Sequence, residues 1–253
     1  MEESKIIPAN LKMVSEINWK NLSEKRIYFG HQSVGFNIVD GIKDVLKEHQ
    51  GIRLNIVETN NTSDFNAPIF AHSRVGQNSD ITSKCQAFID IVENGVGDRS
   101  DMAFFKFCFL DVTEGTDVEK MFGEYKRTLS LLEQKYPRTV FVHVTVPLTT
   151  VQTGVKVWIK KLIGKSVYGY DDNIKRNQFN QRLKEEYQGK QPIFDLAAFE
   201  STLPDGRQAL FTSGGKTYFS LAREYTRDGG HLNPLGRKMI AEQFLTFLAN
   251  SIY

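Results

Sequence analysis

The sequence predicts an α/β fold in which a parallel sheet lies between two layers of helices. Five short apolar runs alternate with longer stretches of helical periodicity, which is the pattern of strands and helices in such a fold. Each helical stretch follows a strand, as βαβ winding requires. A chain of 253 residues can bury one full core. We therefore expect a single domain over residues 1–253, a three-layer α/β/α sandwich with about five parallel strands.

The predicted strands are rich in β-branched and aromatic residues and cover 26–29, 52–57, 102–110, 139–146 and 192–196. The predicted helices cover 34–48, 79–93, 118–136, 172–187 and 234–251. The last helix has the clearest start, because Asn233 can cap it and Pro234 suits its first position. Three long loops remain, at 59–78, 147–171 and 197–233. Long loops after the strands of an open sheet lie where ligands bind.

Charge and composition exclude several classes of protein. Lys plus Arg (32) nearly balances Asp plus Glu (30), and the net charge of +2 gives no general attraction to nucleic acid or to a membrane surface. No apolar run resembles a signal peptide or a membrane span. We expect a soluble protein, either cytoplasmic or exported after loss of a signal peptide, with compartment and oligomeric state left open. Cys85 and Cys108 lack zinc-site spacing, so neither a metal nor a cofactor is predicted.

A serine stands at the turn between the first predicted strand and its helix, in the segment FGHQSVG over residues 29–35. Ser33 would lie above the sheet edge, near the positive end of a helix dipole and near free backbone N–H groups that can stabilise an oxyanion. Gly30 and Gly35 have the spacing of a phosphate-binding loop, but Phe and Asn follow where that loop needs Lys and Ser or Thr. Ser33 is therefore either a nucleophile or a helix cap.

Asp228 and His231 stand three residues apart in an Asp-Gly-Gly-His turn immediately before the last predicted helix. The turn allows the two side chains to meet, so that the carboxylate can fix the imidazole tautomer and stabilise its charged form. A doubly wound sheet would place this turn and Ser33 at the same edge. The three residues could then form a Ser-His-Asp triad, the alternative being a capped turn with an incidental histidine.

These segments resemble the SGNH, or GDSL-like, hydrolases. That family has an early serine after the first strand, a later oxyanion glycine and asparagine, and a late Asp-x-x-His before the C-terminal helix. Residues 30–33 resemble the first block, with Gln32 where the family usually has Asp, and residues 228–231 match the last block. The resemblance runs from about Arg26 to the C-terminus. It implies a flavodoxin-like sandwich and catalytic roles for the three triad residues.

The blocks that would supply the oxyanion hole match less closely. Gly76 is the best match to the oxyanion glycine, and its N–H could act beside that of Ser33. In the third block, Leu110 stands where the family has its asparagine. Either another donor replaces that asparagine or backbone groups act alone. The candidate replacement donors are Asn78, Lys106 and His31.

The resemblance implies a serine-dependent carboxylic ester hydrolase that removes small acyl groups, especially acetyl, from a carbohydrate or similar substrate. Two alternatives remain. An O-acetyltransferase would pass the acyl group from Ser33 to a hydroxyl, and a non-catalytic carbohydrate-binding protein could use an eroded hydrolase fold. The basic amphipathic segment 155–167 could be a lid, a contact for an acidic polymer or membrane surface, or a solvated helix.

Overall fold

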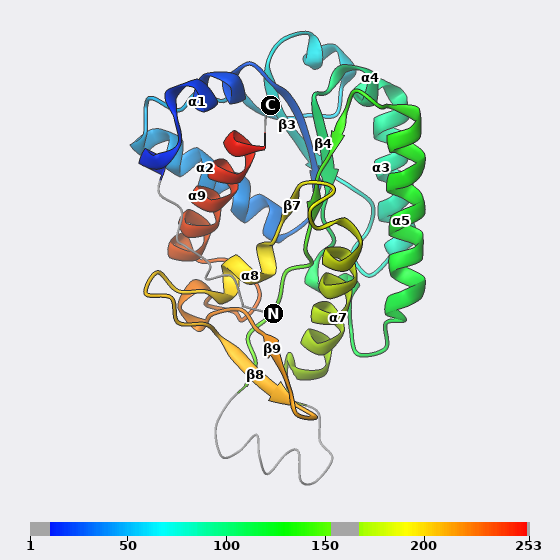
Figure 1. The fold of residues 1–253 in the computed structure, drawn as a ribbon, viewed down its shortest axis with the longest axis vertical. Coiled ribbons are helices and arrows are strands. Elements are labelled where there is room, and N and C mark those ends of the chain that lie inside the picture. Colours follow the sequence, from blue (N-terminus) through cyan, green and yellow to red (C-terminus); the bar gives the residue numbers. More distant parts are fainter. Residues whose placement is uncertain (1–10, 153–166, 252–253) are drawn as a thin grey trace.

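A computed structural model of the chain describes residues 11–152 and 167–251. A five-stranded sheet with the order β2-β3-β1-β4-β5 lies between two layers of helices (Figure 1). All four strand pairings are parallel. Its strands are β1 (Arg26–His31), β2 (Ile56–Glu58), β3 (Ile69–Arg74), β4 (Met102–Phe105) and β5 (Val140–Phe141). The predicted three-layer α/β/α sandwich is confirmed.

The helices divide between the two faces of the sheet. On one face lie α1 (Glu16–Ser23), α2 (Val34–Glu48) and α9 (Pro234–Asn250), and on the other lie α3 (Ile81–Ile91), α5 (Val118–Lys135) and α7 (Tyr170–Tyr187). Two short helices are α4 (Gly97–Arg99) and α8 (Leu196–Ser201). Single turns of other helix types cover Leu11–Met13, Thr62–Asn66, Val92–Val96, Phe109–Asp111 and Arg223–Tyr225. The five predicted helices are present, with ends within two residues of the expected ones.

One predicted loop contains a central strand. The expected loop 59–78 includes β3, which lies between β1 and β2. The polar residues His72 and Ser73 break the apolar run of this strand in the sequence. Both have partners in the structure, because His72 Nδ1 lies 3.1 Å from His31 Nε2 and Ser73 Oγ lies 2.7 Å from Tyr28 Oη. Buried polar groups with partners can occupy a strand.

Other predicted strands are shorter or divided. The run 102–110 ends as a strand at Phe105 and continues into the turn Phe109–Asp111. The run 139–146 divides into β5, which pairs with β4, and β6 (His143–Val144), which pairs with β7 (Ile193–Phe194). The expected loop 197–233 contains the antiparallel hairpin of β8 (Leu210–Ser213) and β9 (Lys216–Phe219). Residues 153–166, and with them nearly all of the basic segment, lie outside the described residues.

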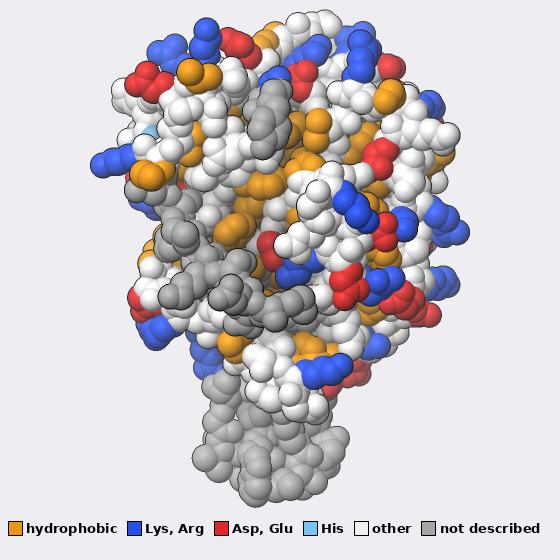
Figure 2. Space-filling model, in the orientation of Figure 1, with side chains coloured by type: hydrophobic (Ala, Val, Ile, Leu, Met, Phe, Trp, Pro, Cys, Tyr) orange, Lys and Arg blue, Asp and Glu red, His pale blue; other side chains and the backbone are white. Residues whose placement is uncertain are grey.

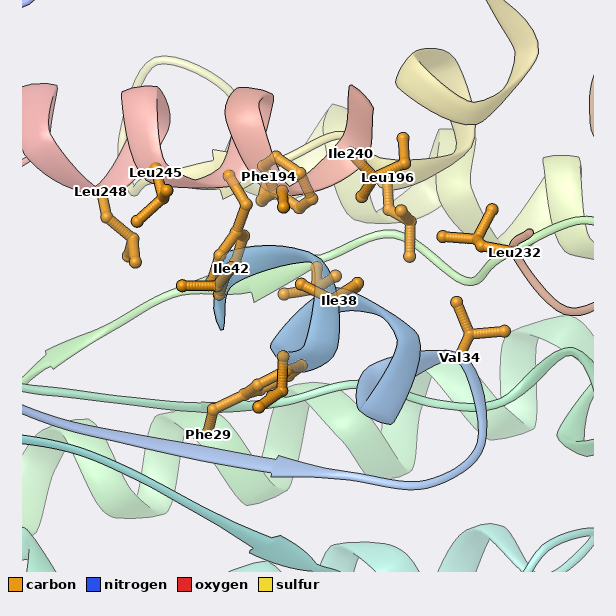
Figure 3. Close-up of a cluster of buried hydrophobic side chains, with 14 of the residues drawn as sticks. Phe29, Val34, Ile38, Ile42, Phe194, Leu196, Leu232, Ile240, Leu245 and Leu248 are labelled. Atoms are coloured by element: carbon orange, nitrogen blue, oxygen red, sulfur yellow. The ribbon is translucent and has the colours of Figure 1, made fainter. Parts of the chain in front are cut away.

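The core between α2 and α9 fixes how these two helices lie. Apolar side chains from both helices and from β1 interdigitate there (Figure 3). A Cβ at Gly41 would lie 2.3 Å from the carbonyl oxygen of Arg237, so the glycine permits the close approach. Val34 and Leu232 lie at the same end of this cluster in Figure 3. They immediately follow Ser33 and His231, so the core brings these two chain segments together.

The described surface carries both signs of charge. Figure 2 shows basic and acidic side chains intermixed around its visible face, with apolar side chains gathered near the centre. No helix within residues 11–152 and 167–251 combines the length and apolar character that crossing a membrane requires.

Candidate active site

The turn after β1 holds Ser33 in a strained conformation. Its φ of 46° and ψ of −106° lie outside the regions that residues with a Cβ usually occupy. Ser33 is the N-cap residue of α2, but its side chain makes no capping hydrogen bond. A Cβ at Gly35 would lie 2.4 Å from the side chain of His31, so this tight turn needs glycine there. The serine hydroxyl is therefore available for another partner.

Asp228 and His231 lie in the turn before α9, in a loop whose two ends are joined by backbone pairing. Thr226 and Leu232 form an isolated antiparallel bridge at its base. Asp228 Oδ1 accepts hydrogen bonds from the backbone N–H groups of Gly230, at 2.9 Å, and His231, at 2.8 Å. Gly229 has a φ of +91°, a conformation that favours glycine. The sequence Asp-Gly-Gly-His thus folds the carboxylate back toward its own imidazole.

Ser33, His231 and Asp228 lie in one hydrogen-bonded row. Ser33 Oγ is 2.6 Å from His231 Nε2, and His231 Nδ1 is 2.7 Å from Asp228 Oδ2. Because a carboxylate only accepts, Nδ1 carries the proton and Nε2 is left to accept one from the serine. The side chains of His231 and Asp228 are 47% and 57% exposed, so the row is open to solvent.

Asp228 remains ionised over the whole physiological pH range. Burial alone would raise its pKa. The hydrogen bonds from the N–H groups of Gly230 and His231 and from the imidazole outweigh burial, and they hold the pKa of Asp228 well below its usual range. The carboxylate can therefore stabilise an imidazolium that forms beside it.

Further contacts hold the histidine turn in place, and the sequence alone did not reveal them. Asn37, on the first turn of α2, accepts a hydrogen bond from the N–H of Leu232 at 3.1 Å. The ring of Phe109 meets that of His231 edge to face, with centroids 5.5 Å apart. Buried Arg176 in turn donates through Nε to the carbonyl of Phe109 at 3.0 Å. The turn is thus fixed both to α2 and to the segment after β4.

Gly76 lies beside Ser33 at the same edge of the sheet. Strand β3 pairs with β1 up to His31 and Arg74, and the N–H of Val75 continues the ladder by donating to the carbonyl of His31 at 3.2 Å. Gln32 Nε2 donates to the carbonyl of Gly76 at 2.8 Å. Within the described residues, neither the N–H of Ser33 nor that of Gly76 has an acceptor. Both donors are free to bind another group.

Several solved structures resemble the chain, and two of them match most of its length. A candidate platelet activating factor from Streptococcus pneumonia has a TM-score of 0.51 at 15% sequence identity, and the match covers 94% of each chain. A candidate GDSL-like lipase from Parabacteroides merdae ATCC 43184 has a TM-score of 0.50 at 15% identity, covering 88% of this chain and 95% of that one. The chain has an SGNH/GDSL-like hydrolase fold. Neither a family model nor a curated protein sequence matches it.

The residue at the position of the SGNH asparagine and the candidate replacement donors differ in how exposed they are. Leu110, at the asparagine position, is 44% exposed. Asn78 is exposed, and its Oδ1 accepts a hydrogen bond from Lys84 Nζ at 2.9 Å. Lys106 is buried beneath the surface and donates to the carbonyl of Phe107 at 3.3 Å; burial lowers the pKa of this lysine to about 8. Its burial makes Lys106 less suited than Asn78 to contact a substrate directly.

The buried pair of His31 and His72 lies beside the turn that carries Ser33. Burial, together with the charge of Lys106, lowers the pKa of His31 to about 2, and burial also lowers the pKa of His72. Both rings are therefore neutral near pH 7. Between residues 11 and 152 and between 167 and 251, no group of three or more His, Cys, Asp or Glu side chains is arranged to hold a metal ion.

Proposed function

We propose that the chain is a serine ester hydrolase with Ser33 as nucleophile, His231 as general base and Asp228 as the group that orients the imidazole. The observation that carries this proposal is the 2.6 Å hydrogen bond between Ser33 Oγ and His231 Nε2. That hydroxyl does not cap its helix, which argues against a purely structural serine. The strained backbone of Ser33 also supports a functional role, since strain of this kind gathers at active sites.

In the proposed reaction, His231 Nε2 takes the proton from Ser33 as Oγ attacks the ester carbonyl carbon. The N–H groups of Ser33 and Gly76 stabilise the negative charge that forms on the carbonyl oxygen. The tetrahedral intermediate collapses, and the imidazolium gives its proton to the departing alcohol. Water, activated by the same imidazole, then attacks the acyl carbon and releases the carboxylic acid and free Ser33.

We further propose small acyl esters, in particular acetyl groups on carbohydrate, as substrates. The exposure of His231 and Asp228 supports this choice of substrate, because a bulky alcohol group of the ester can remain in solvent while the acyl group is bound at Ser33. A groove also opens beside Leu110. Its lining combines hydroxyl side chains (Ser79, Thr82, Thr113 and Thr116) with charged ones (Asp80, Asp117, Lys120 and Glu124).

The experiment that tests the proposal is hydrolysis of p-nitrophenyl acetate by the wild type and by Ser33→Ala. We expect release of free acetate by the wild type and its loss in Ser33→Ala, whereas Ser23→Ala, a change at the half-buried C-terminal end of α1, retains the wild-type rate. Esters of longer acids and an acetylated oligosaccharide define the acyl and alcohol preferences. Equal rates for wild type and Ser33→Ala would refute the proposal. Acetyl transfer to an added sugar without free acetate would favour the O-acetyltransferase alternative.

A further inference from the structure

A fully buried ion pair lies beneath the loop that follows β3. Lys84 Nζ and Asp111 Oδ2 are 2.5 Å apart, and both side chains have no exposed surface. Lys84 belongs to α3, and Asp111 ends the turn after β4. Burying two charges is costly unless each makes further hydrogen bonds. The other partners of this pair therefore indicate what it holds in place.

The carboxylate of Asp111 joins two loops. Its Oδ1 accepts from the N–H of Ser79 at 2.8 Å, and its Oδ2 accepts from the N–H of Cys108 at 2.6 Å. Ser79 Oγ also donates to the carbonyl of Leu110 at 3.2 Å. Ser79 has a φ of +65°, so these bonds stabilise a conformation that serine seldom adopts. They fasten the loop containing Asn78 against Leu110, the position where the SGNH pattern has its asparagine.

The ammonium of Lys84 fixes the orientation of the Asn78 amide. Lys84 Nζ donates to Asn78 Oδ1 at 2.9 Å. An ammonium has only donors, so the amide oxygen must face it and the NH₂ group must face away. Within the described part of the chain this NH₂ group has no acceptor, and Asn78 is exposed. Asn78 lies two residues after Gly76, whose carbonyl is bound by the Gln32 side chain beside Ser33.

We infer that Asn78 Nδ2 donates the third hydrogen bond of the oxyanion hole and that the buried pair of Lys84 and Asp111 positions it. This inference rests on the proposed function. Asn78 thus supplies the hydrogen bond that the SGNH asparagine would donate. It belongs to the loop after β3, which packs against Leu110, the position of that asparagine. Lys84 and Asp111 act only through Asn78, so they are positioning residues.

The first test is Asn78→Asp, with Gln77→Ala as a matched control in the same loop. Aspartate keeps the oxygen that Lys84 binds but loses the donor. We expect kcat on p-nitrophenyl acetate to fall by roughly 10²-fold or more, as for loss of one oxyanion donor. We expect KM and the thermal unfolding midpoint to change little. Gln77→Ala should leave all three quantities unchanged.

The second test shows whether Lys84 and Asp111 position Asn78 or only stabilise the fold. Lys84→Gln removes the charge and shortens the side chain, and Asp111→Asn is a second variant should the first fail to fold. A small alkylboronic acid forms a tetrahedral adduct with a serine nucleophile, and one of its oxygens occupies the oxyanion site. We expect folded Lys84→Gln to lose at least about tenfold in kcat and a similar factor in boronate affinity, with KM nearly unchanged. A purely structural pair would lower the unfolding midpoint without changing boronate affinity.

The outcomes separate this inference from the proposed function. An active wild type that depends on Ser33, together with a fully active Asn78→Asp that binds boronate normally, overturns the inference alone. A wild type that neither hydrolyses the ester nor binds boronate overturns the proposed function and the inference with it.

Discussion

Ser33 Oγ and His231 Nε2 lie 2.6 Å apart although 198 residues separate them in the chain. Helices α2 and α9 make this contact possible, because each begins immediately after one of the two segments and they pack closely along their length. Asn37 adds a direct tie from α2 to the N–H of Leu232. The geometry of the row is thus a consequence of helix packing in the core.

Ser33 and His231 should act as one unit. Ser33→Ala removes the covalent route and His231→Ala removes the base, so each change should lower kcat by roughly 10⁴-fold or more. The double variant should be little worse than either single variant. Initial rates on a small acetyl ester at pH 7 to 8, with circular dichroism to verify folding, provide the measurement. Losses that multiply in the double variant would contradict the proposed roles.

Asp228→Ala should be less harmful than His231→Ala. The carboxylate orients and stabilises the imidazole but forms no bond to the substrate, and water can partly replace it at this exposed site. We expect a kcat between those of His231→Ala and wild type on the same ester. An Asp228→Ala enzyme as inactive as His231→Ala, though folded, would show that the carboxylate does more than orient.

The strained backbone of Ser33 predicts an unusual order of stability. Alanine at position 33 keeps the Cβ that disfavours a φ of 46°, whereas glycine adopts this conformation freely. Both variants lose the bond to His231. Ser33→Gly should therefore exceed Ser33→Ala in free energy of unfolding by about 1–2 kcal/mol, after allowing for the greater entropy of unfolded glycine. Urea denaturation measures this difference, and an alanine variant of equal or greater stability would argue against strain.

Acid should destabilise the protein partly through His143. Its Nδ1 lies 2.7 Å from Tyr125 Oη, its Nε2 bonds to Gln191, and burial lowers its pKa to about 4. The unfolded chain binds a proton at this residue below about pH 6.5, whereas the folded chain does so only near pH 4. The stability that the neutral ring contributes is therefore complete above pH 6.5 and is lost as the pH falls toward 4.

Between pH 4 and pH 6.5, His143 alone should change the free energy of unfolding by up to about 1.4 kcal/mol per pH unit. Urea denaturation at pH 7.5 and pH 5.5 should show a smaller acid loss for His143→Gln than for wild type. His31 and His72, whose pKa values are also lowered, add to the loss in both proteins. Parallel stability curves for the two proteins would show that His143 titrates normally when folded.

Much of the fold could be predicted from the sequence, because the long helices carry clear periodicity. Helix α2 was predicted at its observed bounds of Val34–Glu48. The sequence does not predict strand β3, because the polar residues His72 and Ser73 interrupt its apolar pattern. In the folded chain, His72 has His31 as a hydrogen-bond partner and Ser73 has Tyr28, so both polar side chains can lie in this strand. Strand β7 (Ile193–Phe194) lies within the predicted run 192–196. The predicted run 139–146, in contrast, divides into β5 and β6, and this division depends on tertiary pairing, because β5 pairs with β4 whereas β6 pairs with β7 in a separate two-stranded sheet.

For the candidate site, the sequence could indicate the reactive residues but not the residues that hold them in place. Ser33, Asp228 and His231 stand in short segments whose glycine content is visible in the sequence. Lys84 offered one further signal, since this lysine lies on the apolar face of α3 with Cys85 and Phe88, where a charge needs a buried partner. That the partner is Asp111 depends on how α3 packs against the segment after β4, and local sequence does not encode that packing.

Covalent labelling of the intact protein with a fluorophosphonate tests directly whether Ser33 is an activated nucleophile. Such a reagent reacts with a serine hydroxyl that is activated by a neighbouring base, and mass spectrometry of the digested adduct locates the modified residue. We expect one phosphonyl group per chain, on Ser33. Ser33→Ala should carry no label, and labelling of His231→Ala should be much slower. Failure of the folded wild type to react, or a label on another residue that persists in Ser33→Ala, would contradict the assignment of Ser33 as the nucleophile.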